Sequence, residues 1–281
     1  MELCQLSDDL STNCEQWDTT HGIKFLNLKR STCQCIVLIY YNLDQVSFGK
    51  FRNTFIAHSP VMKAYGNGEF VGMAKDICCV EGVFPKHQNI GLLTFDNPDE
   101  AMKCIDSKPE LREPHHYGGY DLFIIPLCSP VQSWPGYRFI QLDIYEPKNS
   151  TVFTKYMNIL VPIVTRHGGH VIAGTTQSGQ FMGARRPSFF FIVQWRSRDA
   201  FFACNAEADN LFCPPAPVPS LEDSNIMTTS THCPPVVRNV KRRVCRDSLL
   251  KKSVTPLQRE SGASCASRIL FELDTQHIAM C

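Results

Sequence analysis

The sequence predicts an α+β fold in which a unit of strand, helix, strand, strand, helix and strand occurs twice, the second time incompletely. Three observations lead to this prediction. Apolar runs typical of strands alternate with helical patterns between residues 35 and 127. A second series follows in the same order between residues 137 and 212, with prolines and glycines at matching places. A proline-rich segment then stands where the last strand of the second unit is expected.

The composition limits the classes of protein to be considered. The chain has 281 residues, 43% of them apolar, enough for two domains or one domain of doubled design. Its net charge of +1 disfavours nucleic acid as a partner, because such binding surfaces carry a strong basic excess. No apolar run approaches the roughly 20 residues of a membrane helix. The first residues lack the pattern of a secretory signal. We therefore expect a cytoplasmic protein, with a nuclear location as the alternative.

The 14 cysteines are scattered along the chain and form no C-x-x-C pair. Without a secretory signal we expect reduced thiols, several of them buried as small apolar residues. Cys33 and Cys35, like the adjacent Cys78 and Cys79, have a poor spacing for zinc. We predict neither a metal nor a cofactor.

The first strand and helix are indicated by apolar spacing. Cys35–Tyr41 is a continuous β-branched and aromatic run, which indicates a central strand. We expect Asp44 to cap the following helix. Pro60 interrupts this helix, and an interior proline costs about 3 kcal/mol, so a kink or break is expected there. Gly66–Gly68 ends it. The inward face carries aromatic residues at helical spacing: Phe48, Phe51 and Phe55.

The remaining elements of the first unit follow in order. One strand is predicted at Glu69–Met73, and it could continue over Asp76–Glu81 after a bulge or turn. The next strand is predicted at Ile90–Phe95. Asn97–Glu100 is the clearest local signal for the start of a helix. It has an N-cap asparagine, a proline at the first helical position and a glutamate whose side chain is expected to reach back to the N-cap. Such a cap contributes about 1 kcal/mol. Tyr120–Pro126 is the fourth strand.

This βαββαβ order is the ferredoxin-like arrangement, an antiparallel sheet with helices on one face. The other face needs a cover, and the second copy can supply it. Tyr137–Tyr145 repeats the first strand, and Phe189–Trp195 answers the third. Pro162 lies six residues before Gly168, as Pro60 lies before Gly66. The aromatic spacing of the first helix also recurs, at Phe153, Tyr156 and Leu160. We expect the two sheets to pack face to face.

The chain divides into four predicted regions. Residues 1–33 form an N-terminal extension, 34–128 the first unit and 137–212 a second, degenerate unit. Residues 213–281 form a tail rich in proline, serine and basic residues, which we expect to be mostly disordered. Within it, Arg268–Leu273 alternates well enough to be a strand and could fill the vacant edge of the second sheet. The alternative is that it belongs to the disordered tail.

Local motifs of the first unit carry a resemblance to a known family. They are the Val80-Glu81-Gly82 turn, Phe84-Pro85, the strand end Thr94-Phe95-Asp96, the cap Asn97–Ala101 and the segment Ser107–Leu111. They resemble the family catalogued as domain of unknown function 1330, although Leu111 stands where that family has a tyrosine. The resemblance covers about Ile36–Leu127, and more weakly Phe139–Phe212.

The resemblance implies a fold and a place for a ligand. That family belongs to the dimeric α/β-barrel group, in which two ferredoxin-like units pack their sheets against each other. It therefore implies an intramolecular dimeric α/β-barrel-like pseudo-dimer, with ligand sites between each sheet and its helices. It implies no agreed reaction.

Three titratable residues are candidates for catalysis. His115 and His116 form the densest such cluster, and histidine can act as a general base near neutral pH. Adjacent histidines on an extended segment face opposite ways, so at most one could enter a cleft; a polar surface turn is the simpler interpretation. Glu81 lies in the turn of the family-like motif and could serve as acid or base. It could equally cap the turn or pair with Lys86.

Our leading functional prediction is non-catalytic binding of a small molecule or a partner through an α/β-barrel cleft, by a monomer or weak dimer. The alternative is a cofactor-independent enzyme, oxygenase-like or isomerase-like, with one working cleft in the first unit that uses Glu81 or a histidine of the 115–116 pair. A third possibility is a scaffold role of the tail. Its basic run Arg238–Lys252 could engage an acidic partner or a nuclear-import receptor, although such runs are often only solvated.

Overall fold

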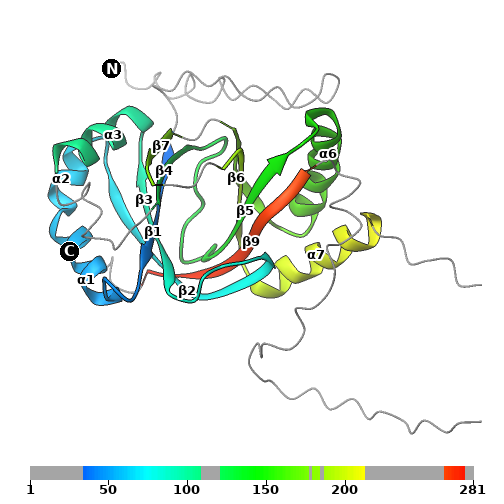
Figure 1. Ribbon diagram of the computed structural model, residues 1–281, viewed down its shortest axis with the longest axis horizontal. Helices are drawn as coiled ribbons and strands as arrows, with labels where there is room; N and C mark the ends of the chain where they lie inside the picture. The colour runs from blue at the N-terminus through cyan, green and yellow to red at the C-terminus, as the bar shows by residue number, and fades with distance from the viewer. Residues whose placement is uncertain (1–33, 109–120, 177–178, 184–186, 213–262, 276–281) are drawn as a thin grey trace, which may run out of the picture.

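A computed structural model describes the chain except for residues 1–33, 109–120, 177–178, 184–186, 213–262 and 276–281. The described residues form one antiparallel sheet of nine strands (Figure 1), in the order β6-β8-β5-β9-β2-β3-β1-β4-β7. The strands are β1 (Cys35–Asn42), β2 (Glu69–Gly82), β3 (Gln88–Phe95), β4 (Asp121–Pro126), β5 (Phe139–Pro147), β6 (His170–Thr175), β7 (Gly179–Met182), β8 (Phe189–Trp195) and β9 (Ala263–Asp274).

The sheet curves into a nearly closed barrel. The backbone N–H of Cys128, just after β4, donates to the carbonyl of Ile172 in β6 at 2.9 Å. This bond joins the two ends of the strand order, because β4 and β6 lie near opposite edges of the sheet. The fold is therefore an α+β barrel built from two ferredoxin-like halves, as the sequence predicts.

The two halves have the same strand pairing. In the first, β1 lies between β3 and β4, with Cys35 opposite Phe95 and Pro126. In the second, β5 lies between β8 and β9, with Phe139 opposite Trp195 and Glu272. The strand predicted at Arg268–Leu273 is thus confirmed as part of β9. It occupies the edge that the sequence leaves vacant between residues 137 and 212.

Each half also lends a strand segment to the other. β2 pairs with β3 over Glu69–Met73 and then with β9 from Met73 to Gly82. In the second half this role is divided, because β6 pairs with β8 while β7 pairs with β4. The exchange ties the two units into one sheet, which explains why β2 is the longest strand of the described residues.

The interior of the barrel is a single apolar core drawn from both halves. Alternate residues of each strand point into it, among them Leu38 from β1 and Leu142 from β5. The rings of Phe123 and Phe190 lie 5.2 Å apart across the interior. The parts of the sheet that belong to the two halves therefore pack face to face, because residues of both halves bury each other in the interior.

Helices cover the outside of the sheet at its two ends (Figure 1). The first half carries α1 (Phe48–Ala57), α2 (Ser59–Ala64) and α3 (Pro98–Ser107), and the second carries α6 (Ser150–Arg166) and α7 (Arg198–Phe212). Beneath each group lies a separate apolar layer formed by the strand residues that face away from the barrel interior. Within the described residues, none of the helices has the length and apolarity needed to span a bilayer.

Two local predictions about α1 can be compared with the structure, and one of them needs correction. The N-cap is Ser47, whose Oγ accepts from Lys50 N at 3.3 Å, and not Asp44. Asp44 N instead donates to Asn42 Oδ1 at 2.8 Å, so the chain makes a polar turn first. The break expected near Pro60 is confirmed, because α1 ends and α2 begins at His58.

The equivalent helix α6 behaves differently. Pro162 lies inside it without a break, and its buried residues Leu160, Ile163 and Val164 hold that segment against the sheet. Its N-cap, Asn149, stands four residues before Phe153, as Ser47 stands four before Phe51. The aromatic spacing, which pairs Phe153 with Phe48, thus differs by about one helical turn from the alignment that the N-caps give. Pro60 and Pro162 give the same alignment of the two helices as their N-caps do.

Candidate functional site

A buried polar group of residues lies in the layer beneath the helices of the second half. We call it the Arg268 cluster. Its members come from four strands and helices that are far apart in sequence: Gln141, Asp143 and Tyr145 of β5, Tyr156 of α6, Asn205 of α7 and Arg268 of β9. Trp195 of β8 joins it by donating from Nε1 to Gln141 Oε1 at 3.0 Å. Polar groups so deeply buried are stable only when they bond to one another.

Arg268 holds this cluster together. Its Nε donates to Asp143 Oδ2 at 3.1 Å, and Nη2 donates to the hydroxyls of Tyr145 at 2.8 Å and Tyr156 at 3.3 Å. Nη1 donates to Asn205 Oδ1 at 3.0 Å. All three nitrogens of the guanidinium are thus used inside the protein, which is the condition under which a buried arginine is tolerated.

Asp143 is the acidic member of the cluster. Its Oδ2 also accepts from Gln141 Nε2 at 2.8 Å and from the Tyr145 hydroxyl at 3.0 Å, while its Oδ1 is buried without a hydrogen-bond partner. Burial raises the pKa of Asp143, and the charge of Arg268 opposes that rise. Burial likewise raises the pKa of Tyr156. Asp143 is thus fully buried, and the polar groups around it bond mainly to one another.

The structure places Glu81 at the edge of this cluster. Glu81 stands opposite Arg268 in the β2–β9 register, and its Oε2 lies 3.8 Å from Arg268 Nη1. Although Glu81 belongs to the first unit in sequence, its part of β2 lies against the second half of the barrel. The other two candidates, His115 and His116, lie outside the described residues. The structure thus joins Glu81 to a partner that sequence spacing did not suggest.

Three of the described cysteines are buried as the sequence predicts, while Cys78, Cys79 and Cys128 are partly exposed. Cys35, Cys104 and Cys204 are buried free thiols. Burial raises the pKa of Cys35 to about 12, that of Cys104 to about 11 and that of Cys204 to about 12. These thiols therefore stay protonated and are poor nucleophiles. In the part of the chain that the structure describes, no group of three histidine, cysteine or acidic side chains is arranged to hold a metal ion.

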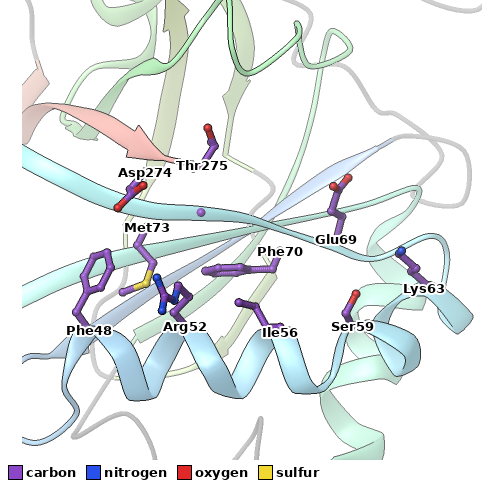
Figure 2. A pocket seen from close by; sticks show the side chains of 11 residues that line it. Phe48, Arg52, Ile56, Ser59, Lys63, Glu69, Phe70, Met73, Asp274 and Thr275 are labelled. Atoms are coloured by element: carbon purple, nitrogen blue, oxygen red, sulfur yellow. The ribbon is translucent and has the colours of Figure 1, made fainter. Parts of the chain in front are cut away.

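A pocket of about 100 Å³ opens on the first half, between α1–α2 and β2 (Figure 2). We call it the α1–β2 pocket. Helix residues and strand residues face each other across it: Phe48, Arg52, Ile56, Ser59 and Lys63 from the helices, and Glu69, Phe70, Gly72 and Met73 from β2. The end of β9 closes it with Asp274 and Thr275. The pocket thus depends on the returning C-terminal strand as well as on the first unit.

Gly72 allows β9 to approach so closely. It has a φ of +153°, and a Cβ there would lie 2.7 Å from the carbonyl oxygen of Asp274. A larger residue would be strained and would push the end of β9 away from the pocket. The register of β2 against β3 shifts at this same point, between Phe70 and Gly72.

Arg52 is the polar residue of the pocket that stands out. Its Nε is buried and has no hydrogen-bond partner, and no ion pair is found for its guanidinium among the described residues. Its two terminal nitrogens, in contrast, are not among the buried atoms without a partner. Figure 2 shows the side chain rising from α1 towards β2, beside Phe48 and Met73. The terminal nitrogens of such an arginine can donate hydrogen bonds to a ligand that enters the pocket.

Sequence reasoning missed both Arg52 and Arg268 as site residues. A usable signal existed for the cluster, because the strand Tyr137–Tyr145 carries Gln141 and Asp143 where Cys35–Tyr41 is apolar throughout. Arg52 directly follows the core residue Phe51 on a predicted helix, and nothing in the sequence around it distinguishes it from a surface arginine.

The sequence matches no family model and no curated protein. Solved structures that resemble the chain include an anthrone oxidase-like protein, with 12% identity and a TM-score of 0.36 over 63% of this chain and 78% of that one. Another is a heme-binding protein from Thermus thermophilus, with 8% identity and a TM-score of 0.38 over 63% of this chain and 83% of that one.

The strand order and pairing define the class of this protein as an α/β barrel of two ferredoxin-like halves. The particular family named from the local motifs, domain of unknown function 1330, stays a prediction, because no family model matches.

Proposed function

We propose that this chain binds a small molecule in the α1–β2 pocket without transforming it. One observation carries the proposal: the pocket combines apolar walls with an arginine whose buried Nε has no partner. Ligand sites are typically concave and mostly apolar, with a few polar groups that fix orientation. The position also agrees with the site that the family resemblance implies, between a sheet and its helices.

The Arg268 cluster is a weaker candidate for the ligand site. Its guanidinium nitrogens already donate to Asp143, Tyr145, Tyr156 and Asn205. A ligand would have to break these bonds and leave buried groups unpaired, each at a cost of about 1–3 kcal/mol. We therefore assign the cluster a structural role, to fix β9 against β5.

The enzymatic alternative lacks a suitably placed acid or base among the described residues. A general acid or base must come within hydrogen-bond reach of the reacting group. Glu81 does not line the α1–β2 pocket and instead lies beside Arg268. The acidic residues that do line it are Glu69, which is exposed, and Asp274, which already has an interaction partner. Binding without turnover is therefore the function that this geometry favours.

A blocked pocket tests the proposal. Ile56 lines the pocket and is 37% exposed, so Ile56→Trp would fill the space without disturbing the buried core. Ile159 on α6 is 47% exposed and lies away from the pocket, so Ile159→Trp is the matched control. In a fragment screen by NMR we expect the control to keep the compounds that the wild type binds and Ile56→Trp to lose them. An unchanged set of bound compounds in Ile56→Trp would refute the proposal.

A further inference from the structure

The state of Arg52 indicates the charge of the molecule that the α1–β2 pocket accepts. Its guanidinium is half-buried on α1 with Nε sealed and unbonded. The guanidinium charge is therefore not paired with an acceptor among the described residues, and its two terminal nitrogens are the ones open to a ligand. A ligand that brings a carboxylate to the two terminal nitrogens would supply charge-assisted hydrogen bonds, which are roughly twice as strong as neutral ones.

The walls of the pocket indicate the rest of the ligand. Phe48 and Phe70 present aromatic rings, and Ile56 and Met73 present aliphatic and thioether groups. Flat rings pack well against aromatic walls and against a planar guanidinium. A volume of about 100 Å³ leaves room for one compact body, on the scale of a single ring.

The two acidic residues of the pocket do not offset this argument. Figure 2 shows Glu69 pointing away from α1, at the end of the pocket where Lys63 also lies. Both of these residues are exposed, so water screens their charges. Asp274 already has an interaction partner. Arg52 is therefore the charged residue that lies beside the apolar walls of the pocket.

We infer that the occupant of the α1–β2 pocket is a small organic monoanion, a carboxylate on a compact apolar or aromatic body, bound through the terminal nitrogens of Arg52. This inference rests on the proposed function, because it names the class of ligand for the same pocket. It adds a specificity-determining residue that separates anions from neutral molecules of the same shape.

Benzoate and benzamide are the probes that test it, because they share size and shape but differ in charge. Binding to the purified full-length chain at pH 7 is followed by the NMR signal of the Met73 methyl group. We expect benzoate to bind about tenfold or more tightly than benzamide, as one charge-assisted hydrogen bond would give. Arg52→Met should abolish this preference, because it keeps an apolar stem and removes the charge. Arg52→Lys should keep part of it, because the charge stays while the planar fork is lost.

Arg166→Met is the control, since Arg166 is an exposed arginine on α6 that pairs with Glu207. It should keep the wild-type preference for benzoate. Equal affinities for benzoate and benzamide, or an undiminished preference in Arg52→Met, would overturn the inference while leaving the pocket as a binding site. If neither probe shifts the Met73 signal, this inference fails, and the fragment screen with Ile56→Trp decides separately whether the pocket binds any small molecule. Should Arg52→Met not fold, the wild-type pair of affinities together with Arg52→Lys decides the question.

Discussion

Arg52 and Arg268 both lie between a sheet and its helices, one in each half of the barrel, yet their surroundings are opposite. Arg268 donates to Asp143, Tyr145 and further residues of its cluster. Arg52 has no such partner among the described residues and lies at a pocket. The comparison teaches that the same residue type can be fully bonded inside one half and lie without such bonds, beside a pocket, in the other.

The strands beneath the helices explain how this difference arises. Ile39 and Leu122 stand opposite each other in the first half, and Asp143 and Arg268 occupy the equivalent pair in the second. β4 belongs to the first unit in sequence, whereas β9 returns only after residues 213–262. A strand that must find its place over such a separation gains from a charged pair, because a slip in register would leave both charges buried alone. We interpret the Arg268 cluster as this register device.

The largest effect is expected from Arg268→Met. Removing one partner of a buried ion pair costs about 3–5 kcal/mol, because Asp143 would remain buried and unpaired. The double variant Asp143→Ile with Arg268→Leu copies the pair of the first half and should recover much of that loss. Urea unfolding measures both free energies. The comparison fails if Arg268→Met costs no more than Arg166→Met on the surface of α6.

A matched pair of tyrosines gives the next largest effect. Tyr145→Phe removes a hydroxyl that donates to Asp143 and accepts from Arg268, so a loss of about 1–3 kcal/mol is expected. Tyr41 occupies the equivalent place in β1, and its buried hydroxyl makes no hydrogen bond of normal geometry. Burial raises the pKa of Tyr41, and the nearby Asn89 side chain opposes part of that rise. Tyr41→Phe should therefore be neutral or stabilising in the same unfolding assay, and equal losses in the two variants would contradict the comparison.

Arg52→Met should change stability little, within about 1 kcal/mol, because Arg52 forms no hydrogen bond or ion pair with another described residue. The free energy of unfolding without ligand is the relevant measurement. A loss as large as that of Arg268→Met would mean that Arg52 also has a structural role, and the contrast between the halves would disappear.

The smallest effect concerns the surface contact between α6 and α7. A hydrogen bond from His167 at 2.6 Å, with the nearby charge of Arg166, lowers the pKa of Glu207. A lowered carboxyl pKa stabilises the fold above the ordinary value near 4.3, and the contribution is lost as pH falls through the folded value. Melting temperatures of the wild type should therefore fall slightly more steeply below about pH 5 than those of Glu207→Gln. Parallel curves would show that this contact contributes nothing.

Much of the fold could be predicted because local patterns determine it. The apolar run of Cys35–Tyr41 and the alternation of Arg268–Leu273 predicted strands, and both are strands. The cap at Asn97 is confirmed, since its Oδ1 accepts from Glu100 N at 2.8 Å. Pairing is not local, so the sequence could not show that β9 lies between β5 and β2. The predicted tail of residues 213–281 thus contains a strand of the second sheet, while most of its other residues lie outside the described part.

The candidate site was less accessible to sequence reasoning. Glu81 was singled out, but its partner Arg268 is remote in sequence, and only the β2–β9 register brings them together. Arg52 differs from any surface arginine only through its burial and its missing partner, which are properties of packing. The boundaries of the predicted domains and the roles of His115 and His116 stay predictions.

The most direct test compares two methionine methyl signals during one titration with benzoate. Met73 lines the α1–β2 pocket, and Met157 lies in the apolar layer beneath the helices of the second half. A ligand site confined to the first half predicts that the Met73 signal shifts to saturation while the Met157 signal stays in place. A saturating shift of Met157, or no shift of Met73, would contradict the account.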